Sequence, residues 1–293
     1  MKFFKLGKKS KKSDNMSTTS SKNSKKSRTS VLSGLFSASA SPAEKLHKHV
    51  ISGDIKKFTL AIEQIKNSSD PSAINTVNQH QQTALHVAAA EGRIEIIKIL
   101  VNQTRIKLNL LDSKQKTALM LAVENQSYNI VEELIKKEAD VDLKDSAGNT
   151  ALHLSCKISS TGISKILIMQ GKANVNAKNI DGQTPLHLAI PAASTVLINL
   201  LLQNKAMINA KDTGGRTPLM LAAYIGLYNI VKHLVVKEAY KYATDNSGRN
   251  AYDHAMAAKF SSIAEFLNTG PGSKNQNKHK VQWPNPNKKR VLS

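Results

Sequence analysis

A recurring threonine-centred motif constrains the fold of this chain more than any other feature. Six segments keep one register, at spacings of 34, 33, 34, 33 and 33 residues. They read Thr83-Ala-Leu-His86, Thr117-Ala-Leu-Met120, Thr150-Ala-Leu-His153, Thr184-Pro-Leu-His187, Thr217-Pro-Leu-Met220 and Asn250-Ala-Tyr-Asp253. A unit of about 33 residues cannot bury its own apolar face, so such units must stack on one another to share a core.

The residue pattern within each unit predicts a pair of short helices. A threonine hydroxyl can accept a hydrogen bond from a free amide in the first helical turn, and Pro185 and Pro218 follow where no N–H is needed. Gly92 and Gly226 come where the first helix should end. The second helix carries aliphatic pairs one turn apart, as between residues 96 and 101, which predicts one buried stripe.

The 33-residue period with Thr-Pro-Leu-His resembles the ankyrin repeat. The resemblance implies an all-α ankyrin-repeat solenoid of about seven repeats, in which hairpin tips and first helices form a concave surface. The expected units are 42–77 as a degenerate N-terminal cap, 78–110, 111–143, 144–177, 178–210, 211–243, and 244–268 as a C-terminal cap. Most units end in Val-Asp, Val-Asn or Ile-Asn, followed by Asp or Asn and usually Gly, which favours turns.

Two units depart from the pattern. Unit 144–177 lacks the glycine between its helices and carries one extra residue, so the register of its second helix is left open. Unit 178–210 contains Pro191, which we expect to shorten its first helix. These irregularities either shape a binding surface or are neutral.

Positive charge is concentrated at the two ends of the chain. The net charge is +21, of which residues 1–41 carry +9 and residues 269–293 carry +6. The N-terminal segment has twelve serines and few apolar residues, so we expect it to be disordered. Prolines at 284 and 286 favour an extended C-terminal segment.

Recurring histidines and one cysteine are the candidates for site chemistry. His86, His153 and His187 are compatible with metal binding, but ankyrin repeats use this histidine in a capping network, and two units have Met instead. Cys156 stands where ankyrin repeats usually have a small residue, so we expect it to be buried rather than nucleophilic. The sequence contains no phosphate-binding glycine loop or serine elbow. We therefore expect no catalysis, cofactor or metal.

The variable positions of the expected concave surface are the candidates for partner binding. They are Lys114, Lys116, Tyr128, Asn149, Ile180, Asp181, Arg216, Tyr224, Tyr228 and Arg249. Exposed Tyr and Arg are favoured anchors at protein interfaces, although a tyrosine can equally cover a second helix. The sequence predicts a scaffold or adaptor, monomeric by itself, that binds another protein.

A short motif in the C-terminal segment suggests one partner. Lys280-Val281-Gln282-Trp283 resembles the docking motif of type 1 protein phosphatase regulatory subunits. In that family the valine and the aromatic residue fill two pockets while the segment adds a strand to a sheet edge. The alternative is a plain flexible tail.

The basic ends allow further interpretations. Their lysine clusters resemble nuclear-import sequences, or they bind an anionic membrane or a nucleic acid through charge. Ser27 and Ser30 lie among basic residues and are candidate phosphorylation sites. One cysteine, no secretory signal and no long apolar run predict an intracellular protein, cytoplasmic or nuclear.

Overall fold

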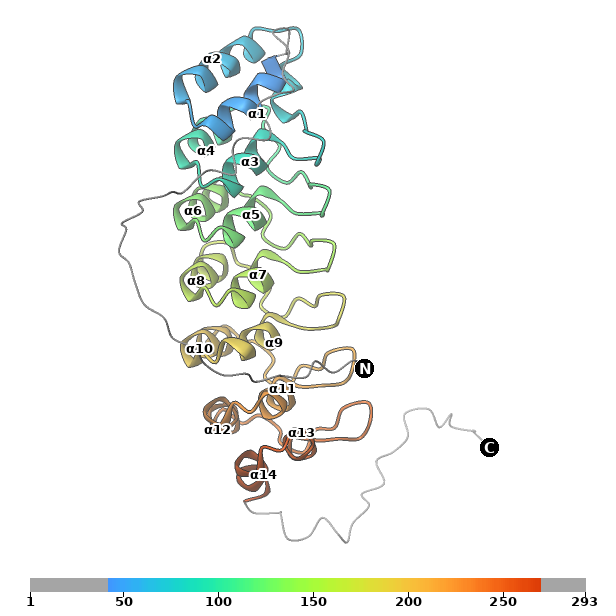
Figure 1. Ribbon diagram of the computed structural model, residues 1–293. Helices are drawn as coiled ribbons and strands as arrows, with labels where there is room; N and C mark the ends of the chain where they lie inside the picture. The colour runs from blue at the N-terminus through green and yellow to red at the C-terminus, as the bar shows by residue number, and fades with distance from the viewer. Residues whose placement is uncertain (1–41, 270–293) are drawn as a thin grey trace, which may run out of the picture. The chain divides into compact units, whose positions relative to one another are not determined.

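The computed structural model describes residues 42–269, which form seven successive pairs of short helices (Figure 1). The pairs are α1 (Pro42–Ser52) and α2 (Ile55–Lys66), α3 (Ala84–Ala90) and α4 (Ile94–Val101), α5 (Ala118–Glu124) and α6 (Tyr128–Lys136), α7 (Ala151–Lys157) and α8 (Thr161–Met169), α9 (Pro185–Ala189) and α10 (Thr195–Gln203), α11 (Pro218–Ile225) and α12 (Tyr228–Val236), and α13 (Ala251–Ala257) and α14 (Ser261–Asn268). Two 3-10 helices, η1 (Pro71–Asn75) and η2 (Ile190–Ala192), complete the helical elements of this range, which contains no strand. The predicted all-α solenoid is confirmed.

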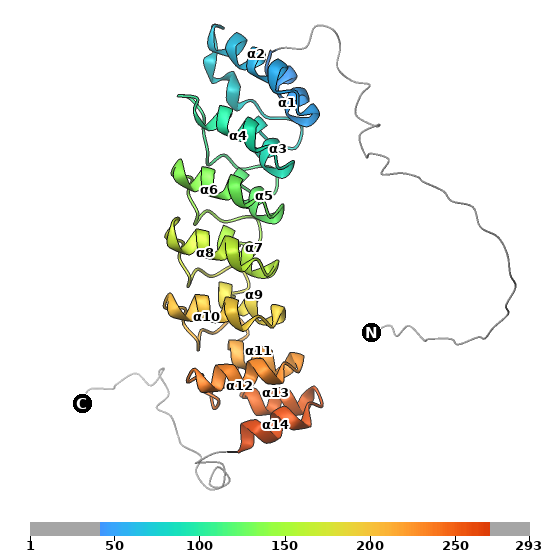
Figure 2. The same ribbon diagram turned by 90° about the vertical axis from the view of Figure 1, so that its left-hand side faces the viewer.

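The helices stack in two columns (Figures 1 and 2). First helices pack on first helices, as α3 on α5 and α5 on α7, and second helices pack on second helices, as α4 on α6 and α6 on α8. Leu85, Leu119 and Leu152 are at most 1% exposed, so each unit contributes a leucine to the continuous core. Burial of each such side chain contributes about 1.5–3 kcal/mol.

A residue with positive φ turns the chain between the two helices of every pair. Ser159, with φ of 61°, takes this place in unit 144–177, so the missing glycine there is replaced without loss of the turn. Gly226 is required, because a Cβ on it would lie 2.4 Å from Cζ of Phe260. Where no such neighbour intrudes, other residues accept the strained conformation.

The extra residue of unit 144–177 is accommodated at the end of α8. The Ala173 N–H donates to the Leu167 carbonyl across six residues (3.0 Å), whereas the equivalent Ala139 N–H donates to Leu134 across five (3.0 Å). The wider turn leaves Ile163 and Leu167 of α8 fully buried. In unit 178–210 the first helix ends at Ala189 and continues as η2, which bears out the expected effect of its proline.

Three histidines connect the first helices to the following hairpins. The N–H of Thr83 donates to Nδ1 of His86 (3.2 Å), and Nε2 of that ring lies 3.1 Å from the Lys116 carbonyl. His153 and His187 make the same contacts to the Gln183 and Arg216 carbonyls (3.0 and 3.1 Å). Because Nδ1 accepts, the proton must be on Nε2 and the ring is neutral.

Burial keeps these three rings neutral. It lowers the pKa of His86, His153 and His187 below the ordinary value of 6.5, and the hydrogen bonds to carbonyls only partly oppose it. Below pH 6.5 the unfolded chain therefore binds protons that the folded chain does not. The stability that the three rings contribute is complete above that pH and is lost as the pH falls towards their folded pKa values.

We predict that the free energy of unfolding falls between pH 7.5 and pH 5.5 and that these histidines cause part of the loss. Urea denaturation of the wild type and of a His86→Met/His153→Met/His187→Met variant measures it. Methionine is a matched replacement because Met120 and Met220 occupy the same position in other units. The variant should lose less stability over this interval, and an unchanged pH dependence would contradict the assignment.

Candidate functional site

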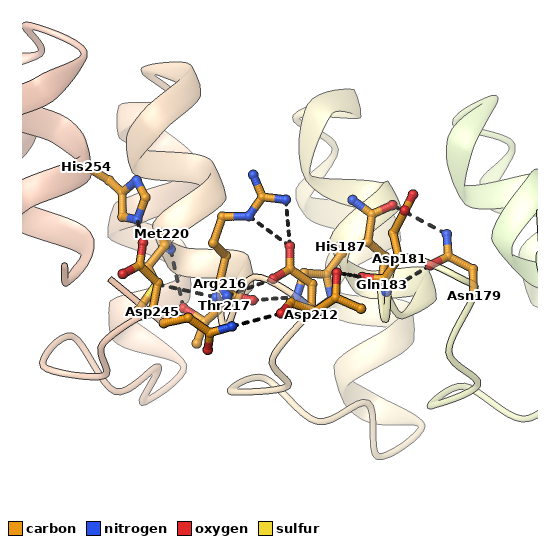
Figure 3. Close-up of polar contacts among 12 residues, drawn as sticks. Asn179, Asp181, Gln183, His187, Asp212, Arg216, Thr217, Met220, Asp245 and His254 are labelled. Atoms are coloured by element: carbon orange, nitrogen blue, oxygen red, sulfur yellow. Dashed lines mark hydrogen bonds and ion pairs between the residues drawn. The ribbon is translucent and has the colours of Figure 1, made fainter. Parts of the chain in front are cut away.

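An aspartate or asparagine side chain closes each hairpin between repeats. Asp112 Oδ1 accepts hydrogen bonds from the N–H groups of Lys114 (2.8 Å) and Lys116 (2.9 Å). Asn179 does the same for Gln183 (2.9 Å), which Figure 3 shows beside the hairpins of Asp212 and Asp245. One side chain thus pairs amides that the helices cannot pair.

Backbone hydrogen bonds join each hairpin tip to the next. The Ile180 N–H donates to the Ala147 carbonyl (3.1 Å), and the Thr213 N–H donates to the Asp181 carbonyl (2.9 Å). Equivalent bonds run from Ser113 to His80, from Ser146 to Lys114 and from Asn246 to Gly214. The tips therefore form a continuous edge, and side chains mounted on it are pre-organised for binding.

A second set of hydrogen bonds, made by side chains, links successive units, and the sequence did not predict it. The Asp or Asn after each aliphatic residue at the unit end was assigned to turn formation alone. In the structure it accepts a hydrogen bond from the next unit: Asn109 from the Asp140 N–H (3.0 Å), and Asn176 from the Met207 N–H (2.8 Å). Asp142 and Asn209 act likewise. The signal in the sequence was their recurrence at one place in the period.

We define the inner face as the hairpins together with the exposed sides of the first helices α3, α5, α7, α9, α11 and α13 (Figure 1). Six predicted partner-binding residues are exposed on it: Lys114, Ile180, Asp181, Arg216, Tyr224 and Arg249. Lys116 lies there too, but its side chain is only 18% exposed and its Nζ is 2.6 Å from Glu124 Oε1.

The other three predicted partner-binding residues are not exposed on the inner face. Asn149 is buried, and its amide links two hairpins by contacts to Asp145 (3.4 Å) and Asn179 (3.1 Å). Tyr128 and Tyr228 begin the second helices α6 and α12. Their side chains lie at the junction with the next repeat, away from the inner face on which they were expected, and they are 44% and 40% exposed.

The contacts of the two tyrosines explain that placement. The Tyr128 hydroxyl lies 3.1 Å from Ser160 Oγ, and its ring occupies the space that a Cβ on Gly162 would need. The Tyr228 ring stands at 62° to the Phe266 ring, with the centroids 5.7 Å apart. Both side chains therefore contact the following repeat while part of each ring stays exposed.

Two arginines of the inner face are fixed by buried carboxylates. Arg216 Nε and Nη2 lie 2.9 and 2.8 Å from Asp212 Oδ2, as Figure 3 shows. Arg249 makes the same paired contact to Asp245 (3.3 and 3.2 Å). The carboxylates are 3% and 2% exposed, whereas the arginine side chains are 46% and 52% exposed. Each guanidinium is thus oriented without being covered.

The Asp245 carboxylate is held in its ionised form. Burial by itself would raise its pKa, but hydrogen bonds from the N–H groups of Arg249 and Ser247 and from the His254 and Arg249 side chains lower the pKa to about 2. His254 Nε2 is 3.0 Å from Asp245 Oδ2. The last hairpin is therefore anchored to α13 by a charged network.

The histidines and the cysteine that were candidates for site chemistry have structural roles. The three capping histidines are bound as described, and residues 42–269 contain no cluster of three His, Cys, Asp or Glu residues suited to a metal ion. Cys156 is fully buried, and burial raises the pKa of its thiol to about 12.

Among the described helices, none has the length and apolar character needed to span a membrane. Lys280, Val281, Trp283, Ser27 and Ser30 lie outside the described residues.

Comparisons with known proteins agree with this architecture. A protein with ankyrin repeats from Schizosaccharomyces pombe is 31% identical over 102 residues, which is 34% of this chain and 44% of that protein. A probable 26S proteasome regulatory subunit of Saccharomyces cerevisiae is 30% identical over 95 residues, covering 32% and 42%. The chain thus spans less than half the length of these relatives.

Structure and family comparison point the same way. The crystal structure of the ankyrin repeat domain of Bcl-3 superposes with a TM-score of 0.67 at 23% identity, covering 75% of this chain and 97% of that domain. The family profile described as ankyrin repeats in three copies matches residues 46–145, 139–212 and 192–278. The chain therefore belongs to the ankyrin-repeat family.

Proposed function

We propose that this protein is a non-catalytic adaptor that binds a partner protein on its inner face. Ankyrin repeats are protein-interaction modules in general, which sets the class of function. The observation that supports the choice of face is the hydrogen-bonded edge of hairpins, from which Arg216 is exposed, together with the exposed Tyr224 on the adjoining helix α11. Arginine and tyrosine are the residue types that most often carry binding energy at protein interfaces.

The second helices are a poorer candidate for the binding face. Tyr128 and Tyr228 already contact the following repeat. The groove at α4 and α6 is lined by mixed charges, including Glu95, Lys98, Glu133 and Lys136. The exposed aliphatic and methionine side chains of α8, α10 and α12 number one per helix, namely Met169, Val196 and Val236. Scattered apolar residues are normal on a protein surface and need no partner.

Paired truncations on the two faces test the proposal. Tyr224→Ala/Ile180→Ala removes two exposed side chains of the inner face, and Met169→Ala/Val196→Ala removes two exposed apolar side chains of the second helices. We predict that the inner-face variant captures its partners from native cells about tenfold less efficiently, because anchor truncation costs more than about 1 kcal/mol per residue. The second-helix variant should match wild type in quantitative mass spectrometry, and the reverse pattern would contradict the proposal.

We further propose that the C-terminal segment recruits the catalytic subunit of type 1 protein phosphatase. The support is the resemblance of Lys280-Val281-Gln282-Trp283 to the docking motif of that enzyme's regulatory subunits. In this arrangement the repeats would hold a substrate while the Val281 and Trp283 side chains occupy two apolar pockets of the enzyme.

A matched pair of tail variants separates docking from bulk charge. Val281→Ala/Trp283→Ala should abolish co-purification of the phosphatase, whereas Val291→Ala/Leu292→Ala, which removes two apolar residues of the same tail, should leave it intact. Binding through apolar pockets should depend little on the salt concentration. Binding that survives the first variant and collapses as salt rises would instead favour the alternative function, an electrostatic tether of the basic ends to a membrane or nucleic acid.

A further inference from the structure

We infer that the partner segment on the inner face is acidic: its carboxylate meets Arg216, and a neighbouring apolar side chain rests on Tyr224. The inference rests on the proposed adaptor function and names the chemistry of its partner. We call Arg216, Tyr224 and Arg249 the arginine–tyrosine patch. Both arginines come from hairpins, and Tyr224 lies on α11.

The hairpins do not need these arginines in order to fold. The hairpin of Asn179 is closed by an Asn–Gln pair, in which Asn179 Nδ2 lies 3.4 Å from Gln183 Oε1 (Figure 3). The hairpin of Asn78 repeats this pair, with Nδ2 3.3 Å from Gln82 Oε1. A neutral pair therefore serves the same structural purpose as Asp212–Arg216. Arg216 neutralises the buried Asp212 carboxylate, but the Asn–Gln hairpins show that this position can be closed without either charge.

The geometry of Arg216 suits a second carboxylate. A guanidinium has five N–H donors arranged as a planar fork. Asp212 contacts Nε and Nη2, which leaves the Nη1–Nη2 edge directed away from this internal partner. Arg249 is bound through the same edge by Asp245. A partner's carboxylate can therefore make a bidentate contact with a group whose orientation is already fixed.

Another repeat of the chain shows an acid filling the equivalent place. Lys116 precedes its capping threonine as Arg216 does, and its Nζ is paired with Glu124 Oε1 at 2.6 Å. The residue that corresponds to Glu124 in the repeat of Arg216 is Tyr224. The internal acid is thus replaced by an aromatic ring that is 57% exposed. Arg216 already pairs with Asp212, so a carboxylate from outside would be its second acid, in the place that Glu124 takes beside Lys116.

Tyr224 offers an apolar surface in the same repeat as Arg216, eight residues further along the chain. Its ring stands edge-on to the buried His254 ring, at 88° and a centroid distance of 6.3 Å, which orients it. Ile225 and Met256 on α11 and α13 are also exposed, at 38% and 52%. A segment with an apolar residue next to its acid therefore finds two complementary contacts.

Charge distinguishes this occupant from the alternatives. The chain's own ends are repelled, since residues 1–41 hold ten Lys and Arg against one acid and residues 269–293 hold six against none. The hairpin segments 178–183, 211–216 and 244–249 contain four cations and three carboxylates, which is not the dense positive field that a nucleic-acid backbone requires. Individually placed carboxylates of a protein segment fit better.

Selection from a display library of random 12-residue peptides tests the inference on the full chain. The matched variant is Asp212→Asn/Arg216→Gln, which copies the Asn179–Gln183 hairpin and leaves the net charge at +21. Wild type should enrich peptides with Asp or Glu beside an apolar residue. Those peptides should bind the variant about tenfold more weakly by fluorescence anisotropy. Tyr224→Ala should reduce the preference for the apolar residue while keeping that for the acid.

Each remaining outcome overturns the inference. Equal acid enrichment by wild type and variant would show that the basic ends collect acidic peptides through bulk charge. Enrichment without acids, or no enrichment at all, would exclude an acidic segment while leaving an adaptor for folded partners intact. A 20-nucleotide single-stranded DNA that binds wild type more tightly than the peptides, and loses affinity in the variant, would reassign the patch to phosphates. Circular dichroism and thermal unfolding check that the variant folds.

Discussion

The pairing of backbone amides in the hairpins is the constraint on which the rest of the structure depends. A turn between two helices carries N–H and C=O groups that no helix can satisfy. Here an Asp or Asn side chain pairs two of them within the hairpin, and the carbonyl of the preceding tip pairs another. The hairpins are thereby locked to each other at the same spacing as the helices, so one period governs both the core and the exposed edge.

The sequence predicted the period, the helix pairs, the capping threonines and the shortened helix before Pro191, because each depends on neighbours close in sequence. It did not predict that Asn149 is buried, since its partner Asn179 lies thirty residues away in the next repeat. The position of Tyr128 was not predicted for the same reason, because its hydroxyl contacts Ser160 in the next repeat. Periodicity shows which positions face a neighbouring repeat. Whether a polar side chain there forms a hydrogen bond depends on the residue that the neighbouring repeat places opposite it.

Some polar side chains of the hairpins are paired inside the stack, and others remain exposed at the surface. The exposed ones make the surface of one repeat differ from that of the next. The Asn–Gln and Asp–Arg pairs close their hairpins in the same way, yet only the second leaves an oriented charge at the surface. The Asn–Gln pair shows that such a hairpin can be closed without a charge, and this is why we propose that the charged pair binds a partner.

Hydrogen–deuterium exchange of the full chain, with and without a captured partner protein, tests the central claim that the inner face is the binding face. The account predicts slower amide exchange in the partner complex at hairpin residues 211–216 and 244–249 and in α11, with α10 and α12 unchanged. Slower exchange confined to the second helices, or to residues 269–293 alone, would contradict it.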